Sequence, residues 1–121
     1  MSVSTIDLAE VEKFSKLSGS WWDEEGFFKT LHEINPLRIA YIKSQILARL
    51  GGMEVSLLDI GCGGGLVTEP MSRLGARVTG IDAAKENVEA ARIHGASVGL
   101  SIDYYATSAE DLAQSKKQYD V

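Results

Sequence analysis

The stretch VSLLDIGCGGGL, residues 55–66, decides the fold of this chain. It combines a short apolar run that ends near the carboxylate Asp59, a loop with four glycines among residues 61–65, and an apolar residue that opens the next segment. Glycine suits such a loop because it adopts backbone angles that other residues resist, and because it lets a ligand approach the main chain. We therefore expect a buried strand over 55–60, a ligand-binding turn, and a helix whose free N–H groups face a bound group.

Helix and strand patterns alternate after the glycine loop. We expect helices over 66–74, 84–98 and 109–116, strands over 77–81 and 101–105, and a further strand from Tyr119. Strands and helices in strict alternation predict parallel strands joined by right-handed crossovers. The fold class is therefore α/β, and the pattern is that of the front half of a doubly wound, mostly parallel, Rossmann-like sheet.

The residues before the glycine loop have a helical pattern. Apolar spacings of three and four predict a helix over 5–18 and a second helix over 36–50, which begins at Asn35-Pro36. Residues 20–34 between them are rich in aromatic side chains, and we expect them to be irregular.

We expect two parts, an N-terminal helical cap over 1–50 and a βαβαβα half-domain over 51–121. The last residues, from Tyr119, look like the entry to a fourth strand. An α/β domain of this class uses about 150 residues or more to cover both faces of its sheet. We therefore expect the front half of a larger fold, truncated at the fourth strand. A small domain that is completed by oligomerisation is the alternative.

The composition is that of an ordinary globular protein and excludes several classes of function. The 121 residues are 45% hydrophobic and 24% charged, with a formal net charge of −5. An acidic chain of this kind does not suit nucleic-acid binding, which needs clustered Lys and Arg. No apolar run approaches the roughly 18–20 residues of a membrane span. With one cysteine, Cys62, and no targeting pattern, we expect a cytoplasmic protein of bacterial type without a metal cluster.

The spacing within the glycine loop discriminates between cofactors. The dinucleotide fingerprint G-x-G-x-x-G fits Gly61 and Gly63, but its third position falls on Leu66. A P-loop requires Gly-Lys-Ser/Thr, and residues 55–72 contain neither Lys nor Arg, which agrees with a ligand that has no phosphate. The pattern D-x-G-x-G-x-G does match, from Asp59 to Gly65. A glycine-rich turn without a ligand is the alternative, with Cys62 as a small residue that fits the loop.

A second carboxylate, Asp82, ends the next expected strand. It lies 21 residues after Gly61, about the distance at which an acid in a βαβ unit accepts hydrogen bonds from ribose hydroxyls. A carboxylate suits this role because it has two acceptor oxygens and no donor. The alternative is an ordinary N-cap of the helix over 84–98.

The pattern from Asp59 to Gly65 resembles motif I of the class I S-adenosylmethionine (SAM)-dependent methyltransferases. More specific elements surround it, and together they resemble the ubiquinone-biosynthesis O-methyltransferase family, of the 3-demethylubiquinone 3-O-methyltransferase type. These elements are SWWD at 20–23, FKTLH at 28–32, INPLR at 34–38, YI at 41–42, LDIGCGGG at 58–65 and VTGID at 78–82.

The resemblance implies a set of cofactor-binding residues. Arg38, Gly61 and Asp82 match cofactor-binding positions of the family, and a guanidinium at Arg38 can pair with the methionine carboxylate. Alternatively, Arg38 is a solvated charge on its helix. The resemblance places Asp59 near the methionine amino group, with Gly63 and Gly65 completing the loop. It also implies that the loop after the third strand contacts the adenine through Ser108 and Ala109, for which a plain helix cap is the equal alternative.

The resemblance further implies transfer of a methyl group from SAM to a phenolic hydroxyl of a polyprenylated phenolic or quinol substrate. The family's second half, with an acidic cluster linked to a divalent cation and a lipid-facing region, is absent here. A divalent cation and peripheral membrane contact are therefore expected only of the missing half, and a homo-oligomer is open. We assign no catalytic residue: His32 and His94 are expected to be structural or solvent-exposed. For Trp21 and Trp22 we favour core packing over a lid.

Three alternatives remain open at this point. The chain can be a non-catalytic SAM-binding or assembly module, with its sheet edge covered by another copy. It can be a class I methyltransferase that acts on another small molecule. A nicotinamide-dependent oxidoreductase is disfavoured, because Leu66 occupies the third fingerprint position.

Overall fold

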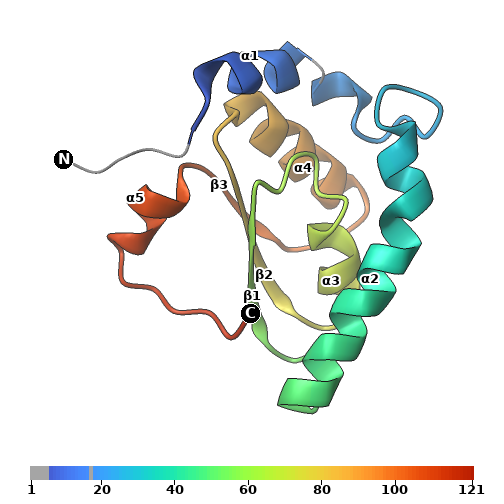
Figure 1. Ribbon diagram of the computed structural model, residues 1–121, viewed down its shortest axis with the longest axis vertical. Helices are drawn as coiled ribbons and strands as arrows, with labels where there is room; N and C mark the ends of the chain where they lie inside the picture. The colour runs from blue at the N-terminus through green and yellow to red at the C-terminus, as the bar shows by residue number, and fades with distance from the viewer. Residues whose placement is uncertain (1–5, 17) are drawn as a thin grey trace.

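Three parallel strands form the centre of the computed structural model, which describes residues 6–16 and 18–121 (Figure 1). β1 (Ser56–Ile60), β2 (Arg77–Asp82) and β3 (Asp103–Ala106) lie in the order β1-β2-β3. The register pairs Ile60 with Ile81 and Asp82 with Ala106, so the carboxyl ends of the strands meet at one edge of the sheet. The expected α/β class with a parallel sheet is confirmed.

Helices complete the crossovers between the strands. α3 (Thr68–Arg73) contacts β2, α4 (Lys85–Ser97) contacts β2 and β3, and α2 (Lys29–Leu50) contacts α3. In Figure 1 these helices lie to the right of the strands, and α5 (Ala109–Ala113) lies to the left. The core between α2, α3 and the sheet consists of buried apolar side chains: Ile46, Val55, Leu57, Met71, Ala76 and Val78. This core includes Ile46 of α2, so the N-terminal helices and the sheet share a core. The expected division into two parts at residue 50 stays a prediction.

The expected start of α2 was wrong. Helix α2 begins at Lys29, not at residue 36, and Pro36 lies inside it. Proline cannot donate a hydrogen bond to the carbonyl four residues earlier, so it is ordinarily found in the first turn of a helix, where that bond is not made. Tertiary contacts hold the extra turns here: the His32 ring lies 2.8 Å from the Trp21 carbonyl, and Asn35 donates to the Leu66 carbonyl at 2.8 Å. Among the described residues, no helix, α2 included, is long and apolar enough to cross a membrane.

Other boundaries shift by a few residues. α1 (Leu8–Lys16) begins after Asp7, whose Oδ1 accepts the N–H of Ala9 at 2.9 Å; residue 5, the expected start, lies outside the described residues. A short 3-10 turn, η1 (Ser18–Ser20), follows. Helix α5 ends at Ala113 rather than at residue 116, where the backbone turns into the left-handed region (φ 59°).

The end of the chain lies along the free edge of β1. Leu58 N–H donates to the carbonyl of Val121 at 2.9 Å, and Asp120 N–H donates to the carbonyl of Ser56 at 3.0 Å. The expected strand from Tyr119 does not form as a regular strand, but the hydrogen bonds of Asp120 and Val121 place the end of the chain beside β1, on the edge that faces away from β2. β1 therefore has neighbours on both edges, which is the position of a topological switch point in a doubly wound sheet.

We expect Met71→Ala to lower the free energy of unfolding by about 2–5 kcal/mol, because Met71 is fully buried and truncation leaves a cavity. Urea unfolding followed by circular dichroism measures the change. Leu37→Ala, at a position that is 76% exposed on α2, is the matched control and should change stability by no more than about 0.5 kcal/mol. Equal costs for the two variants would contradict the assignment of the core.

Candidate functional site

The glycine loop leaves the carboxyl end of β1 and is tied to β2. The N–H groups of Gly61 and Cys62 both donate to the carbonyl of Ile81, at 2.8 and 2.9 Å. Gly61, Gly63 and Gly65 have positive φ angles of 75°, 54° and 98°, which only glycine adopts without strain. A Cβ atom at Gly61 would meet nothing within 4 Å, so the main chain is open to a ligand there.

Trp21 packs flat on the next part of the loop. A Cβ atom at Gly63 would lie 2.5 Å from Cη2 of Trp21, and one at Gly64 would lie closer still to its Cγ. The indole also stacks on Phe28 with ring centroids 3.7 Å apart, and Trp22 donates from Nε1 to the Gly64 carbonyl at 2.8 Å. Two of the glycines therefore make room for a protein side chain, and the packing favoured for the two tryptophans is observed.

Gly65 and Cys62 face away from the open side of the loop. A Cβ atom at Gly65 would lie 2.8 Å from the hydroxyl of Tyr104, and Cys62 packs with Val88, Ala91 and Tyr104. Burial raises the pKa of the Cys62 thiol, so it stays protonated at neutral pH. Gly65 was expected among the cofactor-binding residues. In the structure its Cβ position faces the protein interior, where the absence of a side chain allows the loop to pack.

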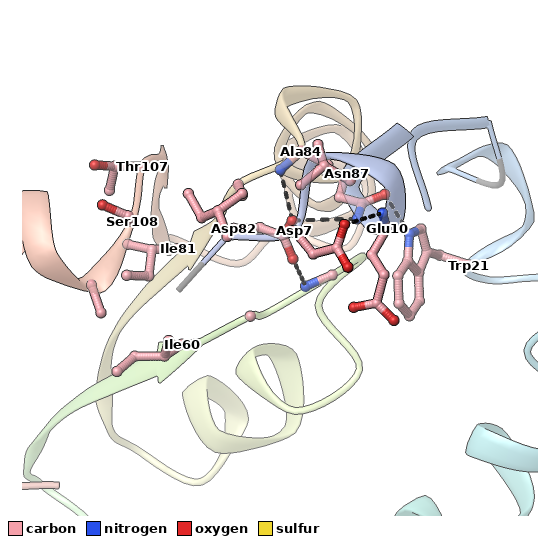
Figure 2. Close-up of a pocket in the computed structure, with 16 residues that line it drawn as sticks. Asp7, Glu10, Trp21, Ile60, Ile81, Asp82, Ala84, Asn87, Thr107 and Ser108 are labelled. Carbon is pink, nitrogen blue, oxygen red and sulfur yellow. Dashed lines mark hydrogen bonds between the residues drawn. The ribbon is translucent and has the colours of Figure 1, made fainter. Parts of the chain in front are cut away.

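The carboxylate of Asp82 fixes the loop against the end of β2 (Figure 2). Its Oδ2 accepts the N–H of Gly63 at 2.9 Å, and its Oδ1 accepts the N–H of Ala84 at 2.9 Å. Asn87 donates from Nδ2 to the same Oδ1 at 3.4 Å. The N-cap position of α4 is Ala84, with no side-chain cap. Asp82 therefore does not cap α4, and it lines the pocket instead.

A pocket of about 340 Å³ opens at the carboxyl ends of the strands (Figure 2). Five of the expected site residues line it: Gly61, Gly63, Asp82, Ser108 and Ala109. Asp7, which precedes α1, and Glu10, in the first turn of α1, also line the pocket. No sequence pattern singled them out, because acidic residues at the start of an amphipathic helix are ordinary. Trp21 and Asn87 also line the pocket. The lining carries three carboxylates and, among the described residues, neither Lys nor Arg, so it favours a cationic ligand over a phosphate.

Arg38 and Asp59 lie outside the pocket lining, and the charge of Asp59 interacts with those of Arg38 and Asp82. Burial raises the pKa of Asp59 to about 6, the Arg38 guanidinium lowers it, and Asp82 adds to the increase. Arg38 donates from Nη2 to Asn35 at 2.7 Å, whereas its buried Nε has no hydrogen-bond partner. A buried guanidinium N–H without an acceptor is available to a carboxylate of a ligand.

Ser108 caps a helix and also lines the pocket, so the cap is observed and the adenine contact stays a prediction. Its Oγ accepts the N–H of Asp111 at 3.1 Å and so caps α5. Ser108 and its neighbour Ala109 also line the pocket, on the side formed by the loop after β3. Capping leaves the hydroxyl hydrogen free to point elsewhere, so the two roles do not compete.

The comparisons with known proteins agree with this geometry. The family model described as methyltransferase domain matches residues 58–121. Proteins named ubiquinone biosynthesis O-methyltransferase are similar over most of the chain: that of Mesorhizobium japonicum is 49% identical over 98% of this chain and 51% of its own length. That of Cereibacter sphaeroides is 50% identical over 99% and 52%. The chain thus spans about half the length of the curated relatives it matches.

Solved structures show the same fold. Magnesium protoporphyrin IX methyltransferase from Synechocystis PCC 6803, determined with bound SAM, matches with a TM-score of 0.70 and 20% identity. The match covers 98% of this chain and 62% of that one. The plantazolicin methyltransferase BpumL in complex with SAH matches with a TM-score of 0.56 and 24% identity, over 93% of this chain and 46% of that one. These matches confirm the expected Rossmann-like parallel sheet as the fold.

We expect the Asp59 carboxyl to titrate near pH 6, measured by the NMR chemical shift of its carboxyl carbon. Arg38→Gln should raise this midpoint because a favourable charge is lost, and Asp82→Asn should lower it because a repulsive charge is lost. The folded state holds this proton more tightly than the unfolded chain, so the contribution of Asp59 to stability falls as the pH rises from about 4 to 6. Arg49→Gln is the control, and a midpoint near 3.8 would contradict the assignment.

Proposed function

Because this chain belongs to the methyltransferase domain family, we propose that it is the cofactor-binding part of a SAM-dependent O-methyltransferase of ubiquinone biosynthesis. The proposed reaction transfers a methyl group from SAM to a phenolic hydroxyl of a polyprenylated ring. The name shared by the relatives supports the reaction. The observation that carries the proposal is the Asp82 carboxylate, held at the pocket by the N–H groups of Gly63 and Ala84.

The residues present fit the chemical groups of SAM. Arg38 would offer its buried N–H, which has no acceptor, to the methionine carboxylate. Asp59 lies near enough to Arg38 for the guanidinium to lower its pKa, and its carboxylate would attract the ammonium group. The open main chain at Gly61 admits the ligand. Asp82 would accept hydrogen bonds from the ribose, and Ser108 and Ala109 would flank the adenine.

When bound, SAM supplies an electrophilic methyl group on a positively charged sulfur. The contribution of this chain is to orient the cofactor from both ends, which provides much of the rate of a direct displacement. The carboxylates of Asp7, Glu10 and Asp82 favour the cation. A phenol has a pKa near 10, so its proton must be removed by a base or a metal, and we assign neither to the described residues.

The finer features implied by the family stay proposals. Among the described residues no group of three His, Cys, Asp or Glu is arranged to hold a metal ion. The divalent cation that the family resemblance implies stays a proposal for the part of the relatives that this chain does not span. Peripheral membrane contact is placed there as well. Action on another small molecule, and a non-catalytic role as a SAM-binding or assembly module, are the alternatives. A homo-oligomer would cover apolar side chains that are exposed here outside the pocket, such as Tyr105.

A nicotinamide cofactor is the weaker candidate for this pocket. A dinucleotide would bring a pyrophosphate beside the carboxylates of Asp7, Glu10 and Asp82. The negative charges of the pyrophosphate and of these carboxylates would repel each other. Among the described residues that line the pocket there is no Lys or Arg to offset this repulsion. A calorimetric titration with S-adenosylhomocysteine (SAH) and with NADH separates the two cofactors, and binding of NADH alone would overturn the proposal.

We expect Asp82→Ala to weaken SAH binding at least about tenfold, because a hydrogen bond to a charged group contributes roughly 1.5–3 kcal/mol. Isothermal titration calorimetry on the 121-residue chain measures the affinity. Asp103→Ala is the control: this exposed aspartate lies at the opposite end of β3 from the pocket and should leave SAH binding unchanged. Unchanged affinity in Asp82→Ala would remove Asp82 from the site.

We expect Arg38→Gln to weaken SAH about tenfold or more, and to leave 5′-methylthioadenosine unaffected, because that nucleoside lacks the amino-acid carboxylate. Arg49→Gln, at an exposed position in the last turn of α2, is the matched control. A comparable loss for both ligands would show that Arg38 supports the fold of the site and does not contact the amino acid.

A further inference from the structure

Asn87 is a buried polar residue of the pocket that the proposed function leaves without a role. It lies near the start of α4, is 2% exposed, and sits between Trp21 and Asp82 (Figure 2). Its Oδ1 accepts the indole N–H of Trp21 at 2.9 Å, and its Nδ2 donates to Oδ1 of Asp82 at 3.4 Å. A buried amide costs free energy unless both of its ends are satisfied, and here each end has a partner.

The chemistry of Trp21 fixes which way this amide points. An indole nitrogen can only donate, so the carbonyl end of Asn87 must face Trp21. The NH₂ end is thereby turned toward Oδ1 of Asp82. An ionised carboxylate has no hydrogen to donate, so this oxygen acts as the acceptor. The hydrogen-bond network itself selects the amide orientation, which settles the choice between oxygen and nitrogen.

The consequence concerns the free acceptor capacity of Asp82. Its Oδ1 accepts from Ala84 and Asn87, and within the described part of the chain its Oδ2 accepts from Gly63 alone. A carboxylate oxygen accommodates about two hydrogen bonds. The remaining acceptor site of the group is therefore on Oδ2, on the side of the glycine loop that lines the pocket.

We infer that Asn87 is a positioning residue, which orients the Asp82 carboxylate so that Oδ2 is presented to a ribose hydroxyl of the ligand. This inference rests on the proposed function and names a determinant of its selectivity for ribose. Trp21 acts through Asn87 in the same chain of hydrogen bonds, so the segment before α2 contributes to recognition of the sugar. Without Asn87, the main-chain N–H groups of Gly63 and Ala84 alone hold the carboxylate.

The test compares SAH with its 2′-deoxy and 3′-deoxy analogues by calorimetric titration of the 121-residue chain. The wild-type chain should bind at least one deoxy analogue more weakly than SAH. Asn87→Ala should weaken SAH about three- to tenfold, the range for one hydrogen bond, and change the affinity for that analogue less than about twofold. The preference for ribose therefore falls, which a general loss of structure would not produce.

Two further variants keep the test decisive if Asn87→Ala does not fold. Asn87→Asp retains the acceptor for Trp21 and removes the donor to Asp82, so it should lose the ribose preference as well. Trp21→Phe keeps an aromatic ring on the glycine loop and removes the N–H that orients the amide, so it should lose part of that preference. Lys85→Ala, at an exposed position of α4, is the control and should bind all the ligands as the wild-type chain does.

The outcomes separate this inference from the proposed function. If the wild-type chain binds no SAH, the proposed function fails and the role of Asn87 fails with it. If it binds SAH but the Asn87 variants keep the wild-type ratio of SAH to deoxy-analogue affinity, the positioning role alone is overturned. Equal binding of SAH and both deoxy analogues by the wild-type chain also overturns it.

Discussion

The hydrogen bond from the Gly63 N–H to Oδ2 of Asp82, 2.9 Å long, joins the two halves of the site. The parallel register of β1 and β2 makes it possible, because it brings the ends of both strands to one edge of the sheet. Residue 63 reaches the carboxylate in a left-handed conformation, with φ of 54°, and a Cβ atom at this position would collide with Trp21. The glycine thus meets three demands at one position: backbone angle, close packing and an anion partner.

The same register has an electrostatic cost. It places the carboxylates of Asp59 and Asp82 at one end of the sheet, where burial and mutual repulsion raise the pKa of Asp59 to about 6. The Arg38 guanidinium offsets part of this cost, while its own Nε stays buried without an acceptor. A ligand that brings both an ammonium and a carboxylate group would satisfy both residues. Shifted pKa values and polar groups without partners are typical of binding sites, because groups that are already fully paired cannot form new hydrogen bonds or ion pairs with a ligand.

Local patterns predicted the strands, the glycine loop and Asp82, because each depends on residues close in sequence: an apolar run, a cluster of glycines, a fixed spacing. They failed where distant residues decide. The start of α2 before Pro36 depends on contacts of His32 and Asn35 with Trp21 and Leu66. The Cβ position of Gly65 faces Tyr104, which the sequence could not foretell, since a glycine signals a missing Cβ atom and not what fills the space. Its part in cofactor binding stays a prediction. Asn87 gave no signal, because its partner Trp21 lies 66 residues away in the sequence.

These distant contacts explain how a flexible sequence can form a defined pocket. Four glycines within five residues lose much conformational entropy when the loop takes one shape. The segment before and within α2 compensates: Trp21 covers Gly63 and Gly64, Trp22 donates to the Gly64 carbonyl, and Asn35 donates to the Leu66 carbonyl. The loop is thereby ordered before any ligand arrives, so a ligand that binds does not have to provide that ordering free energy. The N-terminal helices, which the sequence presents as a separate cap, are in this sense part of the construction of the site.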